Sequence, residues 1–174
     1  MPTGMLFLTQ LILGYVAWLL CFRTYGLPRL RSMDRAQAHR AIATLHGFRF
    51  FGLVFLVPGV VGPGLPAGFA PAAAYGDLAT ALLAILALLT VRTRPLFWAF
   101  VVAFNLVGAG DLLLDYVHAV RGGLPEHAGA LGTTYVIPIL YVPLLMITHA
   151  FALYDLARPR PKLASDHSDV ATAS

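Results

Sequence analysis

Five long runs of apolar residues, separated by short polar or Gly/Pro-rich segments, dominate the pattern of this 174-residue chain. A helix needs about 17–25 mostly apolar residues to cross a bilayer. The runs are 5–22, 41–61, 75–91, 96–119 and 133–153, and each has that length. The pattern therefore predicts an all-α, polytopic bundle of five membrane-spanning helices within residues 1–157. Residues 158–174 lack apolar periodicity, which predicts a disordered cytoplasmic tail.

The composition supports lipid as the solvent of this chain. Hydrophobic residues make up 59% of the sequence and charged residues 11%, whereas soluble domains carry roughly 25% charged residues. The mean hydropathy is +0.76. So few charges cannot cover the surface of a soluble protein, and the length predicts a single domain. A single cysteine, Cys21, excludes an internal disulfide.

The basic residues lie in places that set membrane orientation. Eleven of the twelve Lys and Arg residues fall on one side of the predicted spans, and Arg121 lies on the other. The positive-inside rule then puts the N-terminus outside and the C-terminus in the cytoplasm. Because these residues occupy short loops between spans, nucleic-acid binding is not expected. The excess of Arg over Lys, with abundant Ala and Gly, favours a bacterial inner-membrane protein.

Local signals predict where several helices begin and bend. Asp34 and Gln37 have capping-box spacing, so the second helix is expected to start well before the membrane. Pro95 is suited to the first turn of the fourth helix. Asp77 is expected to cap the third helix. Pro138 and Pro143 are expected to kink the fifth span.

The fourth span carries an unusual row of polar residues along an otherwise apolar helix. At about 100° per residue these positions share one narrow arc of the helix surface. The row consists of Gly108, Asp111, Asp115 and His118, with Asn105 at its edge. A charge facing hydrocarbon costs several kcal/mol, so this face is expected to contact other helices or a water-filled cavity.

Asp111, one of these acids, is expected to lie at nearly the same depth in the membrane as Arg49. Arg49 lies eight residues inside the second span, about 12 Å from its cytoplasmic edge, and Asp111 lies about 12 Å from the outer edge. Across a core of about 30 Å, only about 6 Å of depth separates them. We therefore predict a buried polar cluster of Arg49, Asp111 and Asn105. His46, one turn from Arg49, is expected to reach the headgroups instead.

Two histidines suggest a cofactor site. His46 and His149 lie at similar depth on different helices, and opposed imidazoles are what a six-coordinate haem requires. Arg49 could pair with a haem propionate or polarise a quinone carbonyl. The leading hypothesis is thus the binding of a small molecule or lipid-soluble cofactor, haem or quinone, at His46, Arg49 and His149.

Other functions are also compatible with the sequence. Asp111, Asp115 and His118 could form a proton ladder of a small transporter, or hold a metal ion. A membrane-embedded enzyme on a lipid substrate is a further alternative, although no catalytic motif accompanies it and no catalytic residue is assigned. The polar face could equally contact another protein, as in an accessory subunit of a membrane complex or in a homo-oligomer.

Overall fold

The computed structural model of the chain describes residues 1–158, and this part is all-helical, without strands. The sixteen residues of the expected C-terminal tail from position 159 onward lie outside the described residues. The long α-helices are α1 (Thr3–Cys21), α3 (Arg35–Gly47), α4 (Phe69–Leu89), α5 (Arg94–Arg121) and α6 (Val142–Ala157). Shorter segments connect or extend them: η1 (Phe22–Gly26), α2 (Leu27–Ser32), η2 (Phe48–Leu56), η3 (Ala128–Tyr135) and η4 (Ile137–Tyr141).

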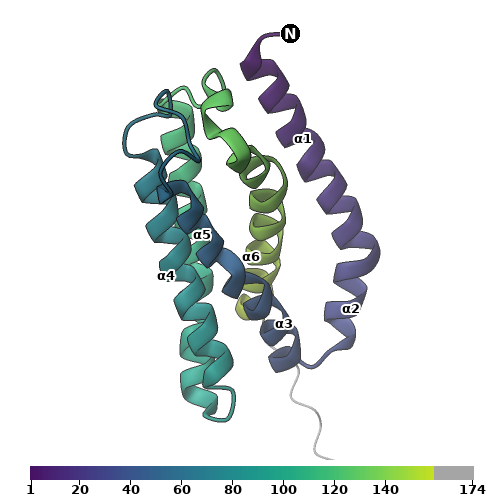
Figure 1. Ribbon diagram of the computed structural model, residues 1–174. Coiled ribbons are helices and arrows are strands. Elements are labelled where there is room, and N and C mark those ends of the chain that lie inside the picture. Colours follow the sequence, from purple (N-terminus) through teal and green to yellow (C-terminus); the bar gives the residue numbers. More distant parts are fainter. Residues whose placement is uncertain (159–174) are drawn as a thin grey trace, which may run out of the picture.

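Four helical segments are long and apolar enough to cross a membrane. They are Thr3–Ser32, Phe69–Leu89, Arg94–Arg121 and Ile137–Ala157. These correspond to the first, third, fourth and fifth predicted spans. In Figure 1 they run side by side along the long axis of the molecule, with α1 at one edge of the bundle.

The second predicted span, 41–61, differs from the expectation. An α-helix covers Arg35–Gly47, and a tighter 3-10 helix, Phe48–Leu56, continues it. The chain then becomes extended at Val57 (ψ 122°). In Figure 1 this segment crosses in front of α5 between α4 and α6, with the Arg49 side chain buried in the bundle and those of Phe48, Phe50 and Phe51 about half exposed. Among the described residues, four helices rather than five are therefore long and apolar enough to span a membrane, and this segment is not one of them.

Three residues are expected from the sequence to mark helix starts. Two of these predictions agree with the structure, and the third does not. The Asp34 side chain accepts a hydrogen bond from the Gln37 backbone N–H at 2.9 Å and caps α3, and Pro95 lies in the first turn of α5. Asp77 does not cap a helix, contrary to prediction. The third helix begins at Phe69, because Pro71 is tolerated in a first turn, so Asp77 faces the bundle interior from the body of α4.

Two apolar cores lie on either side of the polar centre of the bundle. One is built around Phe55, Phe69 and Leu131, and the other around Ile42 and Phe104. Along α4 the buried small residues Ala73, Ala74, Ala81, Ala84 and Ala87 belong to these cores or adjoin them. Such small side chains allow neighbouring helices to approach closely, which is how helices associate in lipid.

The outer face of the molecule is rich in exposed apolar side chains. On α1 alone they include Met5, Leu6, Leu8, Ile12, Leu13, Val16, Leu19 and Leu20. This helix contacts the bundle through a narrow strip in which Gly14 packs directly against the Ile139 carbonyl of η4. The other sides of α1 suit contact with lipid.

Candidate functional site

Arg49 is the centre of a charged cluster in the bundle interior. Its side chain is fully buried. Nε donates to Asp77 Oδ1 and Nη2 donates to Asp111 Oδ2, each at 2.6 Å. Nη1 donates to the Gly108 carbonyl oxygen at 3.2 Å. The structure thus brings together Arg49 and Asp111, as the depth argument predicts, and adds Asp77 as a second carboxylate.

His149 is part of this cluster, and its hydrogen-bond partners determine which of its ring nitrogens carries the proton. Arg49 Nη1 lies 3.3 Å from His149 Nε2, and a guanidinium can only donate, so Nε2 accepts. His149 Nδ1 then carries the proton and donates to Asn105 Oδ1 at 3.0 Å. Asn105 Nδ2 in turn donates to the Val101 carbonyl at 2.8 Å. Asn105 therefore belongs to the cluster through neutral His149 rather than through a bond to Arg49.

His46 is also buried, and its expected position at the headgroups is wrong. Its ring stacks on that of His149, with 3.9 Å between the ring centroids. Thr148 donates its hydroxyl proton to the Leu144 and Leu145 carbonyls, so its oxygen accepts from His46 Nε2 at 3.0 Å. Stacked rings whose Nε2 atoms are both hydrogen-bonded cannot act as opposite axial ligands of a haem. The haem arrangement drawn from these two histidines does not fit this geometry.

Glycines let the helices approach the charged groups. A Cβ on Gly108 would meet His149 Nε2 at 2.5 Å, Thr80 Cγ2 at 2.6 Å and Arg49 Nη1 at 2.7 Å. A Cβ on Gly76 would overlap the Asp111 carboxylate. The cluster is therefore closely packed, and four of the five guanidinium N–H groups of Arg49 have partners. Little donor capacity is left for the propionate or quinone carbonyl that the sequence hypothesis assigned to Arg49.

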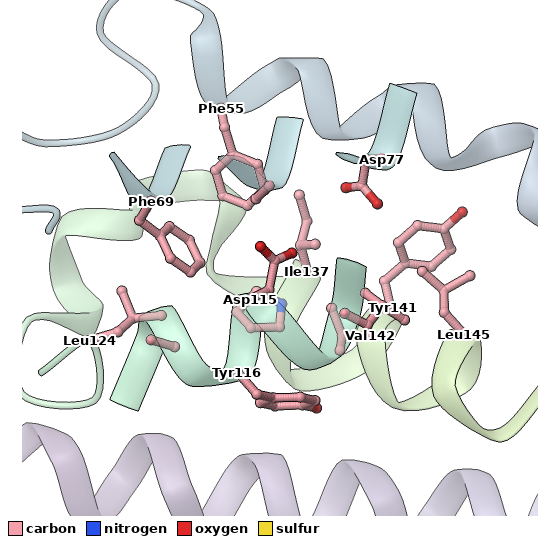
Figure 2. Close-up of a pocket in the computed structure, with 14 residues that line it drawn as sticks. Phe55, Phe69, Asp77, Asp115, Tyr116, Leu124, Ile137, Tyr141, Val142 and Leu145 are labelled. Carbon is pink, nitrogen blue, oxygen red and sulfur yellow. The ribbon is translucent and has the colours of Figure 1, made fainter. Parts of the chain in front are cut away.

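A small cavity adjoins the cluster between α4, α5 and the η4–α6 segment, and Figure 2 shows the side chains around it. Asp77 and Asp115 provide carboxyl groups, Tyr116 and Tyr141 provide hydroxyls, and the remaining lining residues are apolar. Among the described residues, Asp115 accepts no hydrogen bond. The buried Tyr141 hydroxyl likewise has no hydrogen-bond partner within residues 1–158. Of these four polar groups, Asp77 is bound to Arg49 and the Tyr116 hydroxyl lies 2.7 Å from that of Tyr15, so the Asp115 carboxyl and the Tyr141 hydroxyl are the two that have no hydrogen bond to the described residues.

The predicted ladder of Asp111, Asp115 and His118 is divided by this arrangement. Asp111 is bound to Arg49 and Asp115 lines the cavity, whereas His118 is exposed and lines a separate surface pocket with Arg121. Within residues 1–158, no three His, Cys, Asp or Glu side chains are grouped so that they could hold a metal ion.

A second arginine cluster lies near the start of α3 and the end of α6. Arg35 Nε donates to Asp155 Oδ2 at 3.0 Å, and Arg35 Nη2 donates to the Asp155 carbonyl. His39 Nε2 lies 3.1 Å from the same Oδ2 atom, and the Arg35 guanidinium lies over the Trp98 ring. About a quarter of each charged side chain is exposed here. The sequence did not single out this cluster.

The fold and the site together define a helical bundle with four helices long and apolar enough to cross a membrane, and with a charged cluster and a small cavity among its helices. The chain belongs to the family described as domain of unknown function DUF8737, whose model matches residues 6–157. No curated protein and no solved structure matches it.

Proposed function

We propose that this chain is an integral membrane protein that binds a small lipid-soluble molecule in the cavity beside the Arg49 cluster. In this proposal it resides in a bacterial inner membrane, with its N-terminus outside and its C-terminus in the cytoplasm. The topology rests on the uneven distribution of basic residues between the loops. The bilayer supplies the ligand, since the apolar surface of the bundle faces acyl chains.

One observation carries the proposal: two unpaired polar groups, the Asp115 carboxyl and the Tyr141 hydroxyl, line an otherwise apolar cavity. The Tyr141 hydroxyl is buried, and buried polar groups are nearly always hydrogen-bonded, with exceptions that tend to mark functional positions. Apolar pockets with a few convergent polar groups are the usual form of small-molecule sites. The cavity also lies inside the family-matched region.

Native mass spectrometry of the protein in lipid nanodiscs tests this directly. We expect a stoichiometric organic molecule to co-purify with the wild-type chain and to be depleted in Asp115→Asn. Glu126→Gln removes an exposed carboxyl and serves as the matched control, which should retain the molecule. Equal occupancy in both variants, or no retained molecule in any of them, would contradict binding at this cavity.

A second candidate, a proton-coupled carrier, is favoured by the excess of acids. Asp77, Asp111 and Asp115 surround a single buried arginine, so the site has more carboxyl groups than Arg49 can neutralise. Titratable groups of this kind inside membranes often transfer protons. Proteoliposomes loaded with a pH-sensitive dye should then show proton flux that Asp115→Asn abolishes. Flux equal to that of empty liposomes would count against a carrier.

A further inference from the structure

The cavity next to Asp115 is too small to enclose a whole organic ligand. Its volume is about 50 Å³, whereas ligand pockets are typically about 300–1,000 Å³. A space of this size suits a headgroup or a few water molecules. A ligand bound there must extend into a neighbouring space.

A neighbouring groove of about 390 Å³ offers that space. Its lining is almost entirely apolar and includes Trp18, Phe48, Phe50, Phe51, Leu140 and Leu144. Ile137 and Tyr141 line both the groove and the cavity. The groove and the cavity therefore adjoin across these two side chains, and the groove lies on the side of the bundle that α1 flanks (Figure 1).

The groove faces the surface that the bilayer would cover. The side chains of Phe48, Phe50, Phe51 and Leu140 are each about half exposed. A hydrocarbon chain lying in the groove would bury these side chains. Because acyl chains are apolar, it would leave no polar group without a hydrogen-bond partner.

The charge of the site selects the headgroup. Three carboxyl groups lie beside one guanidinium, and His149 is neutral because its Nε2 accepts from Arg49. Arg49 is already occupied by Asp77 and Asp111. Asp115 therefore faces the cavity with no cation of the described chain bonded to it. A negative group in a low-dielectric site favours a positively charged partner.

From the shared lining and the charge complementarity, we propose that the ligand is a single-chain amphiphile with an amine headgroup. Its ammonium lies in the cavity between Asp115 and Tyr141, and its hydrocarbon chain lies in the groove. This inference rests on the proposed function and names its ligand class. Ile137 and Tyr141 separate the two compartments and determine how far the head enters.

Trp18 provides a reporter inside the groove. The chain has two tryptophans, Trp18 and Trp98; Trp98 packs against Arg35 and His39, away from the groove. In a Trp98→Phe variant in nanodiscs, a bromine at the end of a bound chain should quench Trp18 fluorescence. A Trp18→Phe variant, with Trp98 as sole tryptophan, measures quenching by simple partitioning into the bilayer.

The probes are 12-bromododecylamine and the neutral 12-bromododecanol. We expect the amine to quench Trp18 saturably, at a concentration at least tenfold lower than the alcohol, and to quench Trp98 no more than the alcohol does. Asp115→Asn should abolish the tenfold preference, Asp115→Glu should retain it, and Glu126→Gln should leave it unchanged. A monodisperse elution profile in size-exclusion chromatography shows which variants remain folded. If Asp115→Asn does not fold, Asp115→Glu is compared with wild type instead.

The outcomes separate the two proposals. Equal saturable quenching by amine and alcohol overturns the amine headgroup and leaves the binding of a lipid-soluble molecule standing. Absence of saturable quenching overturns the groove, whereas the proposed function then depends on whether a molecule co-purifies in an Asp115-dependent way. A preference that survives Asp115→Asn overturns the charge argument.

Discussion

Two arginine clusters of similar composition lie in different environments within this bundle. Arg35 and Arg49 each donate hydrogen bonds to an aspartate carboxylate and to a backbone carbonyl, and each has a histidine close by. Arg49 is fully buried between two carboxylates, whereas about a quarter of the Arg35 side chain is exposed. The same chemistry therefore has different energetic consequences, because water screens one cluster and is excluded from the other.

Removing Arg49 should produce the largest effect. Arg49→Met leaves Asp77 and Asp111 as uncompensated buried acids, and breaking a buried pair in this way costs about 3–5 kcal/mol. We expect a correspondingly lower free energy of unfolding in mixed-micelle denaturation. The triple variant with Asp77→Asn and Asp111→Asn should recover part of the loss, because it removes the unpaired charges. An Arg49→Met protein as stable as wild type would show that the buried cluster is energetically equivalent to the exposed one.

A smaller loss should follow from a methyl group placed against the buried cluster. Gly108→Ala directs a Cβ at His149, Thr80 and Arg49, and overpacking of this kind costs about 1–3 kcal/mol. Gly110 lies on the same helix with no atom within 4 Å of its Cβ position. Gly110→Ala should therefore be neutral or stabilising by up to about 1 kcal/mol. Thermal unfolding in detergent compares the two, and equal melting temperatures would contradict the tight packing.

The link between Asn105 and His149 tests how far the buried cluster extends. Asn105→Leu leaves the His149 Nδ1 proton without its acceptor, at an expected cost of about 1–3 kcal/mol. In His149→Phe that proton is absent, so adding Asn105→Leu should cost measurably less. The double-mutant cycle in free energies of unfolding gives the coupling. Additive effects would mean that Asn105 stabilises the fold independently of His149.

The smallest effect is expected at Arg35. Arg35→Gln breaks the partly exposed pair with Asp155, and such pairs are worth about 0.2–1 kcal/mol. Raising the salt concentration should shrink the difference between this variant and wild type, because exposed charges are screened. The Arg49→Met difference should change little with salt. Equal salt sensitivity of the two variants would remove the distinction between the clusters.

Much of the architecture follows from the apolar pattern. The long runs overlap the four observed spans over most of their length, and the Asp34 and Pro95 signals mark two helix starts. The proximity of Arg49 and Asp111 is also predictable, because a bilayer turns sequence position into depth and each isolated charge needs a partner at its own level.

Which side chains contact each other in the site is harder to predict than how deep each one lies along its helix. The position of Asp77 in the body of α4 is hard to predict because the Gly/Pro-rich segment before it is typical of a loop, although Pro71 is compatible with an earlier helix start. The sequence puts His46 and His149 at similar depth, but it cannot distinguish stacked rings from rings that face each other across a cofactor. That choice depends on how closely two helices approach and how each side chain rotates.

The helical bundle, its apolar surface and the polar groups halfway along its helices can all be predicted from the amino-acid order, because hydrophobic runs and helical rise are local properties. Three features emerge only when the helices pack together: Asp77 joins Arg49, a 3-10 helix continues α3, and Asp115 faces a cavity. Those features depend on rotations and distances between helices, which arise from packing around glycine and alanine contacts rather than from any one segment.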